Sequence, residues 1–200
     1  VASNAVAFDL TDAATYPNTT AVSQLSITTT PTEAIAGATL TISQITTRGI
    51  NFLSTPITKT TTNGTVTIAD LLGGLVANND VSLGALRTIF GSGDIVVTGT
   101  LSKSGYSFNS GASITITITL GAGDGNAVIN NSYVKIEKTG VGTAKVTIND
   151  PTATVGQLRG TGFNFASVIA SVVSGSAYTE GTITDDFKAT VESLINAGAF

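Results

Sequence analysis

The stretch that most constrains the fold is 113–120, Ser-Ile-Thr-Ile-Thr-Ile-Thr-Leu, in which apolar and hydroxyl side chains alternate without interruption. Successive side chains of a strand point to opposite faces, so Ile114, Ile116 and Ile118 share one face and the threonines share the other. A slip of one residue would move every isoleucine to the threonine side, which fixes the register of this strand. The stretch therefore predicts a central strand with one buried face.

Eight further segments have the alternation or the β-branched composition of strands. They are residues 4–10, 21–28, 38–46, 57–61, 65–68, 95–101, 133–138 and 144–148. Their spacing and the turn residues between them predict a mainly β fold, an antiparallel β-sandwich of jelly-roll type. Asn63-Gly64 is the strongest hairpin signal and predicts that the two segments around it pair with each other.

Four segments have helical spacing and predict a few short helices that lie on the sheet or across its open end. They are residues 67–76, 82–90, 165–173 and 185–197. In the second of them, Leu83, Leu86, Ile89 and Phe90 lie on one face, and Gly91 follows as a stop signal.

Charge is scarce in this chain, since charged residues make up 11% of it and the formal net charge is −4. The Lys and Arg residues do not cluster, so the basic patch that nucleic-acid binding requires is missing. A neutral surface rich in Thr, Ser, Gly and Asn gives little electrostatic repulsion between copies. The composition therefore favours an outer coat, a fibre or an adhesin and argues against a nucleic-acid partner.

The cellular location follows from three features of the sequence. No apolar run approaches the roughly 18 to 20 residues of a membrane-spanning helix. The sequence starts with Val1 in place of Met, which indicates removal of a signal peptide. It contains no Cys, so stability must come from packing or assembly in place of disulfides. We therefore expect an extracellular, cell-surface protein without a membrane-spanning segment.

Catalysis has little support in the sequence. The chain contains no His and no Cys, which excludes nucleophile–imidazole and thiol mechanisms. The densest acidic pair, Asp185-Asp186, lies in the first turn of an expected helix, where the helix dipole explains it. We therefore expect no enzymatic activity, no catalytic residue and no cofactor.

Two kinds of local site remain as candidates. Asp124 lies in the glycine-rich loop 121–126 and could bind Ca²⁺, but the loop lacks the alternating acidic residues of an EF-hand, so a hairpin loop is the default interpretation. Sequons place Asn18, Asn63 and Asn130 in expected loops as candidate glycosylation sites. We therefore expect no metal site beyond the weak candidate at Asp124.

The N-terminal strand, residues 4–10, carries Val6, Phe8 and Leu10 on one face and precedes a polar link that contains Pro17. Such a strand can pair within its own sheet or add to the open edge of another copy. We predict the second arrangement, with residues 1–12 as donor strand and link and residues 13–200 as a single β-sandwich domain. Deleting residues 1–12 is then expected to leave a folded or slightly destabilised monomer that no longer polymerises.

With this strand, its Thr-rich strands and the processed start that we expect, the chain resembles the secreted subunits of surface filaments that assemble by donor-strand exchange. These include bacterial biofilm fibre proteins and archaeal bundling pilins with jelly-roll folds. The resemblance implies extracellular fibres that act in adhesion or biofilm. The chain lacks the Cys pair of usher pili, a C-terminal sorting motif and the long apolar N-terminal helix of type IV pilins, which narrows the kind of filament.

The sequence thus predicts a structural subunit of an extracellular filament or surface coat, which polymerises head to tail with copies of itself. Two alternatives stay open. One is a viral tail-tube or coat protein, which needs the same repeated contacts. The other is a glycan- or ice-binding module, for which Thr115, Thr117 and Thr119 form a ladder. An ice-binding array needs the same repeat on neighbouring strands, and a glycan-binding module usually displays aromatic platforms, for which this chain has no Trp and only four Tyr.

Overall fold

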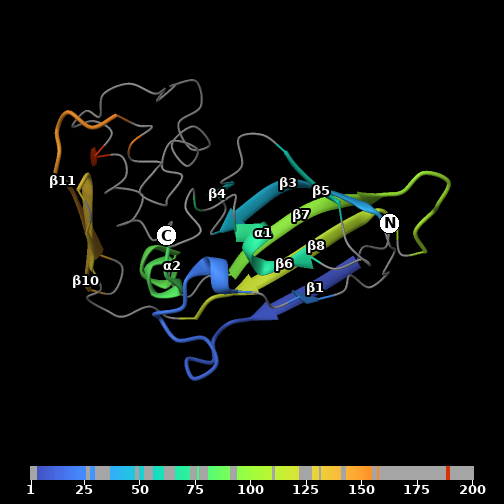
Figure 1. Cartoon of the computed structure of the whole chain (residues 1–200), viewed down its shortest axis with the longest axis horizontal. Coiled ribbons are helices and arrows are strands. Elements are labelled where there is room, and N and C mark those ends of the chain that lie inside the picture. The colour runs from blue at the N-terminus through green and yellow to red at the C-terminus, as the bar shows by residue number, and fades with distance from the viewer. Residues whose placement is uncertain are drawn as a thin grey trace.

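The computed structural model (Figure 1) places a mainly β chain with short helices. It describes residues 4–25, 28–29, 37–47, 50–51, 56–60, 66–72, 76, 81–90, 94–109, 111–121, 128–130, 132–140, 143–154, 157 and 188–189. The expected helix 165–173 and the loop 122–127 lie outside these residues. Of the expected helix 185–197, only Lys188 and Ala189 are described, and both are helical.

The main sheet has six strands in the order β1-β8-β7-β3-β4, with β5 also paired to β3. Its strands are β1 (Asn4–Asp9), β3 (Thr39–Thr47), β4 (Ile50–Asn51), β5 (Ile57–Thr60), β7 (Asp94–Ser102) and β8 (Ser113–Thr119). The strand predicted at 113–120 is confirmed, and it lies between β1 and β7. The strands predicted at 38–46, 57–61 and 95–101 are confirmed as β3, β5 and β7.

One face of the main sheet is buried, as the alternation predicts. Ile114, Ile116 and Ile118 are at most 1% exposed, whereas the threonines between them are half-exposed. The buried face packs against η1 (Val22–Gln24), α1 (Ile68–Leu72) and α2 (Leu83–Phe90), whose apolar residues join the same core. The core therefore lies between the main sheet and these helices, and the threonine face points away from it.

β7 also approaches β3 closely, at a glycine. A Cβ atom added to Gly99 would lie 2.4 Å from the carbonyl oxygen of Thr41. The register between the two strands shifts between Ile42 and Gln44, next to this contact. Because real Cβ atoms do not approach a main-chain oxygen so closely, only glycine fits beside this irregularity.

A second sheet has the order β11-β10-β9, and its strands are β9 (Val128–Asn130), β10 (Val134–Gly140) and β11 (Thr143–Ile148). β10 and β11 lie beyond α2 in Figure 1, at the end opposite the β7–β8 loop. They confirm the strands predicted at 133–138 and 144–148. Val134, Ile136 and Val146 join the common core.

Three expectations about pairing need correction. The segment 21–28 forms the 3₁₀ turn η1 and then β2 (Thr28–Thr29), not one strand. β5 and β6 (Val66–Thr67) were predicted to pair across Asn63-Gly64, which lies outside the described residues, but β5 pairs with β3 and β6 pairs with β2. The sheet is also not wholly antiparallel, because β1 runs parallel to β8. Around Asn63-Gly64, local turn propensity was outweighed by pairing with strands farther away in the sequence.

Helix formation follows the predicted apolar spacing at two places. α2 confirms the helix predicted at 82–90, and Ser82 caps it by accepting a hydrogen bond from Ala85 N at 3.1 Å. α1 begins at Ile68, inside the segment predicted at 67–76, and Thr67 Oγ1 accepts from Asp70 N at 3.2 Å. In the described residues, neither helix has the length and apolar character needed to cross a membrane.

Candidate functional site

β1 is the outermost strand of the main sheet among the described residues, and β8 is its neighbour. The pairing is parallel and in register from Asn4 with Ile114 to Asp9 with Thr119. One further bond, from Leu10 N to Thr119 O at 2.8 Å, extends it. We name the main-chain groups of β8 that face β1 the β8 edge (residues 114–119). These groups are hydrogen-bonded to β1 along the whole length of that strand.

The three predicted assembly residues lie together on the core side of β1. Leu10 is 1% exposed and Phe8 is 5% exposed, and both belong to the core of their own chain. Val6 is half-buried and packs against the same core. The sequence allowed two arrangements for this strand and we predicted docking on another copy, whereas the structure of the single chain describes the strand within its own sheet. Residues 4–12 are therefore not set apart from the rest, and docking on another copy, which stays a prediction, requires β1 to leave this position.

The link after β1 forms a tight turn that two aspartates hold. Asp12 Oδ1 accepts from Ala14 N at 3.0 Å, Asp12 Oδ2 accepts from Thr15 Oγ1 at 2.8 Å, and Tyr16 N donates to Asp12 O. Asp9 Oδ1 accepts from both the amide and the hydroxyl of Thr11. The five residues 11–15 are all exposed. This segment is therefore an ordered but solvent-facing turn, of the kind that can open without disrupting the core.

The two aspartates make the turn sensitive to acid. The hydrogen bond from the Thr15 hydroxyl, followed by that from Ala14 N, lowers the pKa of Asp12 below its ordinary value of 3.8. The hydroxyl and amide of Thr11 lower the pKa of Asp9 in the same way. Because each pKa is lower in the folded chain, each contribution to stability is complete above pH 3.8 and is lost as the pH falls through the folded value.

We expect Asp12→Asn to reduce the acid sensitivity of the fold. Asparagine keeps an oxygen for Ala14 N but cannot gain or lose a proton in this range. The fall in melting temperature between pH 5 and pH 2.5 should be smaller in Asp12→Asn than in the unmodified chain. Asp150→Asn is a parallel case far from β1, because the hydroxyl and the amide of Thr152 lower the pKa of Asp150 in the same way, so it should also reduce this fall. An equal fall in melting temperature in all three proteins would contradict the assignment to Asp12.

Arg87 of α2 joins the ends of β1, β8 and the link. Its Nε donates to Leu120 O at 2.8 Å, and its Nη2 donates to Leu10 O. Its Nη1 donates to Tyr16 O at 2.8 Å and to Asn18 Oδ1 at 2.8 Å. Since Leu10 and Tyr16 flank the exposed turn, one guanidinium closes the turn and fastens it to the end of the β8 edge. We name these four contacts the Arg87 clamp.

The Arg87 side chain is nearly inaccessible to water, with 3% of the residue exposed. All four of its acceptors are neutral oxygens, and it forms no ion pair within the described residues. Burial lowers the pKa of the Arg87 guanidinium, which nevertheless stays protonated at neutral pH because of its very high ordinary value. Within the described part of the chain, this buried positive charge is balanced by carbonyl dipoles, and removal of the side chain would leave those carbonyls without their donor.

Sequence analysis missed Arg87, although the sequence carries a signal for it. Leu83, Leu86 and Phe90 form the buried face of α2, and Arg87 lies at the i+4 position from Leu83, inside that face. A charged residue within an apolar stripe must find hydrogen-bond partners in the core. Those partners are mostly main-chain carbonyls. Every residue has such a carbonyl, so the sequence does not indicate which ones accept from Arg87.

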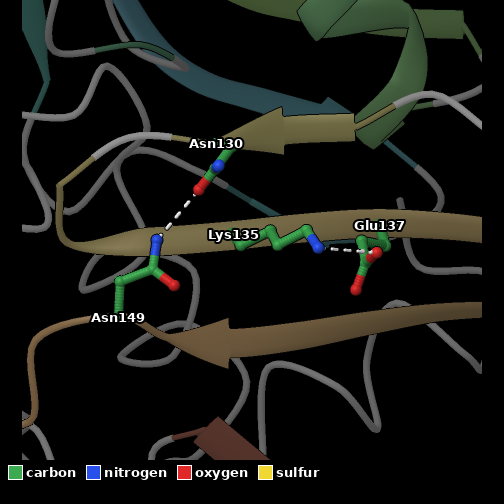
Figure 2. A network of polar contacts seen from close by, with 4 residues as sticks. All are labelled: Asn130, Lys135, Glu137 and Asn149. Atoms are coloured by element: carbon green, nitrogen blue, oxygen red, sulfur yellow. Dashed lines mark hydrogen bonds and ion pairs between the residues drawn. The ribbon is translucent and has the colours of Figure 1, made fainter.

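The candidate glycosylation sites have different surroundings. Asn18 is part of the Arg87 clamp, and a Cβ atom added to Gly84 would lie 2.7 Å from its Cβ, so Asn18 is packed against α2. Asn63 lies outside the described residues. Asn130 is the last residue of β9 and not part of a loop, which corrects the expectation. It is exposed, and its Oδ1 accepts from Asn149 Nδ2 at 2.9 Å (Figure 2).

The neighbours of Asn130 are polar groups of ordinary kind. Lys135, which pairs with Asn130 across β9 and β10, turns toward Glu137 and forms an ion pair with it at 3.0 Å (Figure 2). Both side chains are about one-third exposed, at 35% and 29%, so this pair adds little to stability. Asp124, the candidate calcium ligand, lies outside the described residues, and within them no three acidic residues gather as metal ligands would.

The threonine ladder of β8 does not continue across the sheet. Thr115 faces Thr98 of β7, but Thr117 faces Val96, and on the other side both face alanines of β1. Tyr106 is the one large apolar side chain that is exposed among the described residues, and it meets Phe108 edge to face, with ring centroids 5.0 Å apart. An interrupted ladder and a single exposed ring support neither an ice-binding array nor an aromatic platform.

Comparison with known proteins found no relative of this chain. No protein-family profile matches the chain, no curated protein is significantly similar to it, and no solved structure matches its fold.

Proposed function

We propose that the chain is a structural subunit of an extracellular filament or surface coat, and that copies join head to tail by exchanging β1. The observation that carries the proposal is the position of this strand. β1 is the first described strand of the chain, pairs with one described strand only, inserts Phe8 and Leu10 into the core, and precedes an exposed turn. Each of its contacts within the chain can form equally with the β8 edge of another copy.

The energetics of exchange explain how a closed monomer and a polymer could both exist. Closed and exchanged forms contain the same β1 contacts, so the difference lies in the turn and in the entropy of joining copies. A short tether gives β1 an effective concentration in the millimolar range at its own sheet. The closed form therefore dominates in dilute solution, and exchange requires crowded subunits or exchange during folding.

The surface supports the same proposal. The outward face of β3, β7 and β8 carries mainly Thr and Ser, and its two charged residues beside β8, Asp9 and Asp94, lie at one end. Such a face adds little charge repulsion between copies that meet in series. An extracellular location and the completed jelly-roll sandwich belong to this proposal, and an experimental structure of the assembled material would test both.

Cysteine cross-linking tests the exchange directly, because the chain contains no cysteine of its own. Ala7 and Thr117 are paired neighbours on the outward face, at a spacing that suits a disulfide in a β ladder. We would co-refold an Ala7→Cys chain with a Thr117→Cys chain at high concentration and oxidise the mixture. The expected result is a disulfide between chains as the main product, growing with protein concentration.

Thr100→Cys is the matched control acceptor, since Thr100 is more exposed than Thr117 but lies on β7, one strand farther from β1. Random collisions would favour Thr100→Cys, whereas strand exchange favours Thr117→Cys. The proposal fails if the two acceptors give equal yields while the double variant Ala7→Cys/Thr117→Cys closes efficiently within one chain. Electron micrographs of the concentrated unmodified chain should show filaments.

A further inference from the structure

We propose that Arg87 determines the direction in which the β1 strand of another copy binds, by donating a hydrogen bond to the carbonyl at the carboxyl end of that strand. This inference rests on the proposed strand exchange and assigns a specificity-determining residue to it. The Arg87 side chain donates hydrogen bonds to the end of β1, to the residue after β8 and to the link at once.

The side chains of β1 do not fix the direction by themselves. Val6, Phe8 and Leu10 occur at alternate positions centred on Phe8. If the strand is reversed about Phe8, this residue keeps its place and two aliphatic residues exchange theirs. Parallel pairing is also slightly less stable per residue than antiparallel pairing. Another feature must therefore favour the parallel direction.

In the closed chain, the link supplies that feature. The carbonyls of Leu10 and Tyr16 accept hydrogen bonds from the same guanidinium, so the five residues between them form a loop whose two ends lie close together. A reversed strand would need the link to span the length of β1, about 20 Å at roughly 3.3 Å per residue. When the strand comes from another copy, the link of the receiving chain imposes no such limit.

The main chain of the strand supplies a direction that Arg87 can read. When a strand runs toward Arg87, the carbonyl of each residue lies closer to Arg87 than the N–H of the same residue. The last group of the strand that Arg87 meets is therefore a carbonyl. Leu10 shows this order, because its N–H bonds to Thr119 O and its carbonyl accepts from Arg87. In the reversed strand, the outermost group at this point would be the N–H of Val6.

A guanidinium has only donors, so it binds a carbonyl and opposes an N–H. Its Nε already donates to Leu120 O, the carbonyl at the end of β8. The guanidinium thus bridges two strand ends that leave the sheet in the same direction. With the side chain at 3% exposure, water does not readily satisfy a donor that lacks its acceptor.

The test compares two acceptor positions for an Ala7→Cys donor chain. Parallel insertion places residue 7 opposite Thr117→Cys, whereas reversal about Phe8 places it opposite Thr119→Cys. The acceptor chains carry either Arg87 or Arg87→Met. With Arg87, we expect the interchain disulfide at position 117 to exceed that at position 119 by about tenfold or more, as a charge-assisted hydrogen bond allows. With Arg87→Met, the ratio should fall to near one.

Two further variants keep the result interpretable. Thr88→Val removes a hydrogen bond within α2, from Thr88 Oγ1 to Gly84 O, and should leave the ratio unchanged. If Arg87→Met shows no cooperative thermal transition, Arg87→Gln replaces it, because an amide offers an acceptor as well as donors. An unchanged ratio in the folded Arg87 variant would overturn the inference but leave strand exchange standing. Absence of any interchain disulfide with Arg87 present would overturn both.

Discussion

Arg87→Met is expected to lower the free energy of unfolding by about 3 kcal/mol or more, because it leaves three main-chain carbonyls without their donor. Methionine fills much of the space but leaves the carbonyls of Leu10, Tyr16 and Leu120 without their donor. Each buried carbonyl that loses its partner costs about 1–3 kcal/mol. Urea denaturation followed by circular dichroism would measure the change.

The control for this variant is again Thr88→Val, which alters the next residue of the same helix. It removes one hydrogen bond that starts and ends inside α2, so we expect a loss of about 1 kcal/mol. Arg87→Lys should fall between the two, because an ammonium keeps the charge but lacks the planar fork. A loss below about 1 kcal/mol for Arg87→Met would mean that the clamp is not a main support of the fold.

Removal of residues 1–12 is the second change for which we expect a large effect. The sequence alone predicted a monomer that stays folded or is slightly destabilised. The structure changes that expectation, because Phe8 and Leu10 are core residues. Burial of two such side chains contributes about 1.5–3 kcal/mol each, and the β8 edge loses its pairing as well. A total of this size approaches the whole stability of an ordinary domain.

The truncated chain should therefore unfold well below the melting temperature of the full chain, or lack a cooperative transition. A synthetic peptide of residues 1–12, added in excess, should restore part of the lost stability by binding the empty β8 edge. A peptide with Phe8 and Leu10 replaced by Ser is the matched control and should restore none. Full stability of the truncated chain without peptide would show that β1 contributes little to the core.

The sequence was sufficient where the pattern repeats within one element. Alternation identified β3, β7, β8, β10 and β11, because a half-buried strand shows its two faces in order. Helical spacing identified α2 for the same reason. Both patterns depend on residues within one element, so they can be recognised without knowing how the rest of the chain folds.

The sequence was insufficient where structure depends on distant pairing. Nothing in Val6-Ala7-Phe8 states that its partner is Ile116-Thr117-Ile118, or that the two run parallel. The Asn63-Gly64 signal was outweighed by β3, which offers β5 a long partner. Three of the four acceptors of Arg87 are main-chain carbonyls that any residue could supply, so only the fold brings them together.

The pairing of β1 with β8 also sets an order of events when the chain is made. Asn4 leaves the ribosome long before Ile114, its partner 110 positions later in the sequence. At about 5–20 residues per second, the first strand waits roughly 5–20 seconds before its own β8 exists. During that interval its apolar residues are open to a chaperone or to a finished neighbour. Translation speed would then influence whether a newly made strand ends in its own sheet or in another.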